Sequence, residues 1–132
     1  MSPHKPTLDV GLVTADAAPM LAFYGQALDL PLAGEVRLPG LGVLWKLQCG
    51  DSLIKLLAPF APPAPAVAGT GFAAVGGLRY LTLTVADLAA SLARCRAAGA
   101  PVLIEPTVVR PGLRAAMVAD PDGNAVELMQ QD

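Results

Sequence analysis

The sequence predicts an α+β fold built from two copies of one βαβββ unit. The first observation behind this prediction is an internal repeat, in which the segment around Asp16 recurs around Asp87 at an offset of 71 residues. The second is that each aspartate separates a β-rich run from an amphipathic run. The third is that strand-like runs punctuated by glycine and proline follow in both copies. We therefore expect one domain of 132 residues, with a first module at 8–58, a Pro/Gly-rich linker at 59–77 and a second module at 78–130.

Each copy is predicted to open with a strand and a capped helix. Asp16 and Asp87 suit the N-cap position, because a carboxylate there accepts from the free backbone N–H groups of the first turn. The apolar residues behind Asp16 recur at helical spacing and are Met20, Phe23, Tyr24, Ala27 and Leu28. Behind Asp87 a thinner stripe of Leu88, Leu92 and Cys95 stops at Gly99, a suitable C-terminal cap. We expect both stripes to form core rather than a ligand site.

The strand-like runs come next in both copies. In the first copy they span 32–38, 43–49 and 52–58, and in the second 101–109, 113–119 and 124–130. The last turn, Asp120 to Gly123, combines a proline that presets φ with a glycine that tolerates left-handed geometry, and Asp120 can bond the turn backbone. The strand after it holds Glu127 among apolar residues. A buried carboxylate is costly, so we expect Glu127 to have a specific role.

Composition excludes several classes of partner. The net charge is −2, charged residues make up 15% of the chain, and no basic run is present. Nucleic acid and anionic membrane surfaces are therefore not expected partners. The mean hydropathy of +0.53 is high for a monomer that exposes all of its surface to water. Because surplus apolar surface is commonly buried between subunits, we expect a homodimer.

Compartment and covalent chemistry can also be predicted. The longest uncharged stretch, 56–78, contains too many prolines and glycines for a membrane helix, and no export signal is visible, so we expect a cytoplasmic protein. Cys49 and Cys95 have neither metal spacing nor the pattern of a disulfide framework, and we expect small buried or half-buried thiols. With His4 as the one histidine, placed in the N-terminal tail, a Ser–His–Asp or Cys–His set has no support.

These motifs together resemble the vicinal oxygen chelate superfamily, which includes glyoxalase I, methylmalonyl-CoA epimerase, extradiol dioxygenases, and fosfomycin- and bleomycin-resistance proteins. The resemblance rests on the two βαβββ units, the Phe23–Tyr24 pair and the run from Asp120 to Leu128, and it covers nearly the whole chain. It implies that the paired modules form a half-barrel cleft and that the protein is a dimer. Activity does not follow, since one scaffold hosts many chemistries.

Members of this family that use a metal hold a divalent ion with ligands on four strands. Carried over by position, the resemblance puts these ligands at Asp9, Lys55, Tyr80 and Glu127, of which only the glutamate matches. A lysine ammonium has no lone pair to offer and repels a cation. We therefore expect no metal and no cofactor.

Lys55 has two interpretations, and both stay open at this point. It can replace the metal, with its charge between Asp9 and Glu127 and with the Tyr80 hydroxyl completing the ring. The pKa of one acid could then be held near neutrality for proton transfer, because burial and repulsion oppose the effect of the lysine. Alternatively the three charged groups form a salt-bridge network that only satisfies buried charges.

The function expected from these residues is metal-independent binding of a small, partly apolar organic molecule. Trp45 and Leu47, or their neighbours one register away, are expected to line the cleft, and Arg114 to meet an acidic group of the ligand. The alternative is a metal-independent isomerase or lyase that uses Glu127, Lys55, Tyr80 and Asp9 to move a proton next to a carbonyl. A metal-dependent glyoxalase or dioxygenase requires ligands that this sequence lacks.

Overall fold

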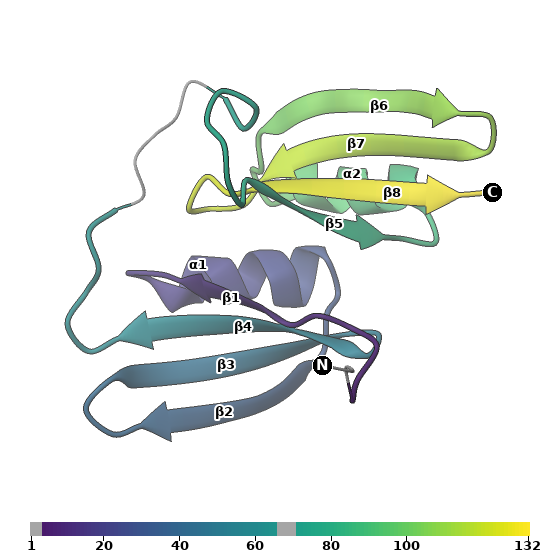
Figure 1. The fold of residues 1–132 in the computed structure, drawn as a ribbon. Helices are drawn as coiled ribbons and strands as arrows, with labels where there is room; N and C mark the ends of the chain where they lie inside the picture. The colour runs from purple at the N-terminus through teal and green to yellow at the C-terminus, as the bar shows by residue number, and fades with distance from the viewer. Residues whose placement is uncertain (1–3, 66–70) are drawn as a thin grey trace. The chain divides into compact units, whose positions relative to one another are not determined.

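The computed structural model describes residues 4–65 and 71–132, and the chain divides into two compact units, residues 1–65 and 66–132. Each unit is a βαβββ module, as the repeat predicts (Figure 1). The predicted fold class is therefore confirmed. Residues 66–70 of the predicted linker lie outside the described residues. Within the described ranges, no helix has the length and apolar character needed to cross a bilayer.

The first module contains four strands and one helical segment. Its elements are β1 (Val10–Val13), α1 (Ala17–Leu21), η1 (Ala22–Ala27), β2 (Leu32–Leu38), β3 (Gly42–Cys49) and β4 (Ser52–Pro59). The strands are ordered β1-β4-β3-β2, with β1 parallel to β4 and the other pairs antiparallel. The bounds of β2, β3 and β4 were predicted to within one residue at each end.

The second module repeats this order. Its elements are β5 (Tyr80–Thr84), α2 (Leu88–Ala97), β6 (Val102–Arg110), β7 (Leu113–Ala119) and β8 (Ala125–Gln131). The sheet order is β5-β8-β7-β6, and β5 runs parallel to β8. In both modules the first strand is therefore joined in parallel to the last, which places residues far apart in the sequence side by side (Figure 1).

The helices begin where the caps were predicted. The Asp16 carboxylate accepts from Ala18 N at 3.3 Å, and the Asp87 carboxylate accepts from Ala90 N at 3.0 Å. The first helix differs from the expected α-helix, because after Leu21 it continues as the π-helical segment η1. There Leu28 N donates to Phe23 O, five residues back. The apolar stripe stays buried across this change, so the prediction of its role is confirmed.

Each helix covers one face of its own sheet, which we call the helix face. In the first module Met20 and Tyr24 are buried together with Leu47, Ile54 and Leu56 of the sheet. In the second module the residues buried between helix and sheet are Leu88, Leu92, Cys95, Val118, Val126 and Leu128. Because side chains alternate along a strand, the residues between these core positions lie on the opposite face. The predicted site residues are divided between the two faces.

Candidate functional site

The turn that leads into Glu127 is built as predicted. One oxygen of the Asp120 carboxylate accepts from Asp122 N at 3.0 Å and from Asn124 N at 2.9 Å, and the other accepts from Asn124 Nδ2 at 2.9 Å. Gly123 has a φ of +86°, the left-handed conformation that glycine adopts without strain. The turn holds the start of β8 in place, and so determines the face on which Glu127 lies.

Glu127 lies on the face of the second sheet away from α2, which we call the glutamate face. It is half-buried beside the buried Met117, so the apolar setting is confirmed, whereas full burial is not. The Thr82 hydroxyl donates to Glu127 Oε1 at 2.9 Å from the parallel strand β5. Among the described residues, Glu127 Oε2 has no hydrogen-bond partner. The Glu127 carboxylate therefore has one oxygen in a hydrogen bond with Thr82 and a second oxygen that a ligand can contact.

Tyr80 lies on the same glutamate face, two residues before Thr82 along β5. Its side chain is 53% exposed, and its ring packs edge-on against Phe72 with the centroids 5.9 Å apart. The structure thus brings Tyr80 and Glu127 to one face of one sheet. Sequence reasoning missed Thr82, although the alternation of Tyr80 and Thr82 in a strand parallel to β8 was a signal for it.

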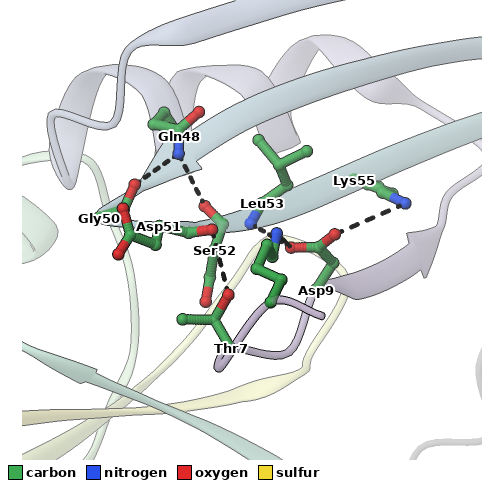
Figure 2. A network of polar contacts seen from close by, with 9 residues as sticks. Thr7, Asp9, Gln48, Gly50, Asp51, Ser52, Leu53 and Lys55 are labelled. Atoms are coloured by element: carbon green, nitrogen blue, oxygen red, sulfur yellow. Dashed lines mark hydrogen bonds and ion pairs between the residues drawn. The ribbon is translucent and has the colours of Figure 1, made fainter. Parts of the chain in front are cut away.

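Asp9 is held in the first module by three groups (Figure 2). Its Oδ1 accepts from Lys5 Nζ at 2.7 Å and from Leu53 N at 2.8 Å, and its Oδ2 lies 4.0 Å from Lys55 Nζ. The hydrogen bond from Lys5, and then that from Leu53, hold the pKa of Asp9 below its ordinary value. Asp9 therefore stays ionised near neutral pH and is a poor proton carrier.

Lys55 points to the face of the first sheet away from the helix, which we call the lysine face. Its side chain is 38% exposed, so the amine is neither buried in a dry hollow nor fully in water. Asp9 and Lys55 lie close together, as the sequence predicted, and the extra contact from Lys5 was not expected. The ring of all four side chains spans both modules and stays a prediction.

Trp45 and Leu47 lie on the helix face, away from Lys55. Trp45 pairs with Leu56, and Leu47 pairs with Ile54, so strand alternation turns Lys55 to the other side. Leu47 is 1% exposed and lies against the helical segment near Gly25. A ligand-binding role for this pair stays a prediction, whereas their neighbours one register away do share the face of Lys55.

Arg114 also lies on a helix face. It pairs with Gln130, whose side-chain oxygen accepts from Leu88 N at the start of α2. Arg114 Nη2 is 3.6 Å from Asp132 Oδ1, in an exposed ion pair. The register thus separates Arg114 from Glu127, and its expected contact with a ligand acid stays a prediction.

Asp9 and Lys55, the two first-module residues at the positions that the resemblance assigns to metal ligands, are a poor donor pair for a divalent metal. In the first module the two positions hold an ammonium and a carboxylate whose Oδ1 already accepts two hydrogen bonds. Across residues 4–65 and 71–132, no group of three or more His, Cys, Asp or Glu side chains is arranged to hold an ion. A cation placed beside Lys55 would be repelled by its ammonium group, which has no lone pair to offer.

Comparison with known proteins agrees with the fold. The family model for the Glyoxalase/Bleomycin resistance protein/Dioxygenase superfamily matches residues 8–128. No curated protein matches the chain. The solved structure of TnmS3, an antibiotic binding protein from Streptomyces sp. CB03234, is 25% identical with a TM-score of 0.70, and the match covers 100% of this chain and 98% of that one.

Two further solved structures have the same fold. The protein SMU.1112c is 25% identical with a TM-score of 0.79, over 96% of this chain and 99% of its own. Lactoylglutathione lyase from Agrobacterium tumefaciens is 23% identical with a TM-score of 0.64, over 98% of this chain and 96% of its own. The three matched structures include a binding protein and an enzyme, so shared architecture does not by itself choose between these functions.

Proposed function

Because this chain belongs to the Glyoxalase/Bleomycin resistance protein/Dioxygenase superfamily, we propose that it binds a small, partly apolar organic molecule without a metal. The observation that carries the proposal is Lys55, an ammonium that lies 4.0 Å from Asp9, at the position to which the resemblance assigns a metal ligand. The ammonium of Lys55 supplies one positive charge, but unlike a metal ion it cannot coordinate two substrate oxygens. Asp9 and Lys55 therefore favour a ligand that is held by protein side chains.

The surroundings of Lys55 support an organic ligand. Leu44 and Leu57 pair with each other on the lysine face and are half-buried, next to Val13 and Val36 in the same row. Small-molecule sites typically combine such apolar side chains with a few polar groups that orient the ligand. The similarity to an antibiotic binding protein is a second support, since that relative binds its ligand on the same fold.

The test is a binding measurement with recovery of the ligand. Small apolar organic compounds are titrated into the protein, and each bound compound is recovered and analysed by mass spectrometry. The proposal expects unaltered compound and an affinity that survives Glu127→Gln. It also expects no stoichiometric zinc, nickel, manganese or iron in protein purified without a histidine tag. Chemical conversion of the compound, or affinity that disappears with EDTA, would contradict it.

A second candidate is a metal-independent isomerase or lyase, and the half-engaged Glu127 favours it. Thr82 holds Oε1 while Oε2 has no partner among the described residues, and Tyr80 lies on the same face. A carboxylate in this state can take a proton next to a carbonyl. This candidate expects solvent deuterium to enter a carbonyl compound, and the exchange to be lost in Glu127→Gln and in Lys55→Met.

The proposal also covers the oligomeric state of the protein and its cellular location. We propose a homodimer, since the mean hydropathy of +0.53 is matched by exposed apolar residues such as Val108 and Val109 on β6. A cytoplasmic location also stays a proposal, and the free thiols of Cys49 and Cys95 are consistent with it.

A further inference from the structure

A row of two lysines and two glycines crosses the lysine face of the first sheet. Gly11 on β1 pairs with Lys55 on β4, Lys55 pairs with Lys46 on β3, and Lys46 pairs with Gly34 on β2. Paired residues on neighbouring strands point to the same side of a sheet. The row therefore places two lysine side chains on neighbouring strands of one face, with a glycine at either end.

The two lysines are an unfavourable pair as they stand. Cross-strand partners have Cβ atoms about 5 Å apart, and like charges directly opposite each other destabilise a sheet. Lys55 has Asp9 as a partner at 4.0 Å, but Asp9 also bonds Lys5, so two lysines share one carboxylate. Lys46 is half-buried and has no ion pair within the described part of the chain. The row thus carries an excess of positive charge in a protein whose net charge is −2.

The space beside the lysines is open. A Cβ atom built on Gly11 or on Gly34 would have no atom within 4 Å. The next row along the strands is apolar and runs Val13, Leu57, Leu44 and Val36 in register. A cationic row beside an apolar row matches a molecule that has an anionic group at one end and an apolar body.

We propose that the ligand of this protein is an organic anion, whose carboxylate or phosphate binds between Lys46 and Lys55 while its apolar body lies along Val13, Leu57, Leu44 and Val36. This inference rests on the proposed binding function and adds the chemical class of the ligand. An anionic oxygen between the ammonium groups relieves their repulsion and gains charge-assisted hydrogen bonds. Neutral compounds with the same body lack both effects.

The test compares three probes with an unbranched alkyl chain of seven or eight carbons, namely octanoate, octyl phosphate and octanamide, by calorimetric titration. The anions are expected to bind at least tenfold more tightly than the neutral amide, with an affinity that falls as salt rises. Comparing the affinities for octanoate and octyl phosphate shows whether the site prefers a carboxylate or a phosphate. In Lys46→Met, anion affinity is expected to fall about tenfold while amide affinity is unchanged.

Two further variants make the test specific. Gly34→Asp puts a carboxylate beside Lys46 in open space, so it is expected to compete with the bound anion without disturbing the sheet. Arg110→Met removes one positive charge from the exposed end of β6 in the other module and is the matched control, expected to leave anion affinity unchanged.

The outcomes separate this inference from the proposed function. Equal affinity for octanoate, octyl phosphate and octanamide, or equal loss in Lys46→Met and Arg110→Met, would overturn the anion site while small-molecule binding stands. Failure of all three probes would overturn the inference, and if other apolar compounds also fail to bind, the proposed function falls with it. Circular dichroism of each variant establishes that the fold is retained.

Discussion

At the scale of single residues, the network around Asp9 is the most informative feature of the first module. One carboxylate accepts from Lys5 and Leu53 and lies beside Lys55, which explains why its pKa is lowered. The Asp9 carboxylate therefore balances the positive charges of both Lys5 and Lys55. The structure shows the Asp9–Lys55 pair that both interpretations of Lys55 contain, and the part of Glu127 in either stays a prediction.

The lowered pKa of Asp9 predicts a specific pH dependence. A carboxyl group with a depressed pKa stabilises the fold above its unfolded-state value of about 4, and this contribution is lost as pH falls through the lower folded-state value. Wild-type protein is therefore expected to be slightly more stable than Asp9→Asn at pH 7, with the two converging in acid. Urea unfolding at a series of pH values measures this.

The control for this experiment is Glu35→Gln, an exposed acid on β2 without a hydrogen bond or ion pair in the described residues. Its difference from wild type is expected to stay small and to lack the convergence. An Asp9→Asn difference that is the same at pH 7 and pH 2 would contradict the assigned cause.

The two cysteines predict unequal thiol reactivity. Burial raises the pKa of both thiols, so neither is a ready thiolate at neutral pH. Cys95 is 0% exposed, whereas Cys49 is half-buried. In native protein, Cys49 is expected to react slowly with a disulfide reagent and Cys95 hardly at all, and both should react once urea unfolds the chain. Native Cys49→Ser protein that still reacts as fast as wild type would refute this.

At the scale of elements, two glycines test how tightly the strands pack. A Cβ on Gly42 would lie 2.2 Å from Ala58 O and 2.7 Å from Pro59 Cα, and neither backbone atom can move without disturbing the pairing of β3 with β4. Gly42→Ala is expected to lower the free energy of unfolding by about 1–3 kcal/mol.

Gly34→Ala is the matched control in the same sheet, because its Cβ would meet nothing within 4 Å. Its effect is expected to stay within about 0.5 kcal/mol. Urea unfolding compares the two variants, and equal effects would mean that the close approach at Gly42 is not what constrains this position.

The caps of the two helices predict a second element-scale effect. Asp16→Ala and Asp87→Ala each remove the acceptor for one N–H group of the first turn, at Ala18 and Ala90. Each is expected to cost about 1 kcal/mol, whereas Asp16→Asn and Asp87→Asn keep a capping oxygen and should cost less. Thermal unfolding distinguishes the pairs. Asparagine variants as unstable as the alanine variants would show that the loss comes from charge and not from capping.

At the scale of the whole molecule, the composition predicts association. The chain mass is 13.5 kDa, and light scattering is expected to give twice this mass. Val108 and Val109, exposed on the edge strand β6, are one place for the surplus apolar surface to be buried. A mass of 13.5 kDa at micromolar concentration would contradict the dimer.

Local features of the chain were predictable because they depend on neighbouring residues. The aspartate caps, the turn at Asp120 and the order of elements all follow from short segments whose chemistry has few alternatives. The π-helical turn at η1 was not predictable in this way, since the spacing of its apolar residues is also that of an α-helix. The apolar residues predicted to be buried are nevertheless buried, because the α-helical and the π-helical turn both place them on the side that faces the sheet.

The candidate site was predicted only in part, and the reason is strand register. The pairing of Asp9 with Lys55 was expected. The hydrogen bond from Thr82 to Glu127 joins β5 to β8, which are far apart in the sequence, and the pairing of Lys46 with Lys55 depends on the register of β3 against β4. Trp45 and Lys46 are neighbours in the chain but lie on opposite faces, because the side-chain period in a strand is two.

The sequence by itself determined the repeated βαβββ order, the caps and the turns. The tertiary structure decided which side chains share a face and which groups bond Asp9 and Glu127. The physical reason is that capping and turn formation are local, whereas the partner of a strand residue is chosen by pairing with a distant strand, where a shift of one residue turns every side chain to the other face.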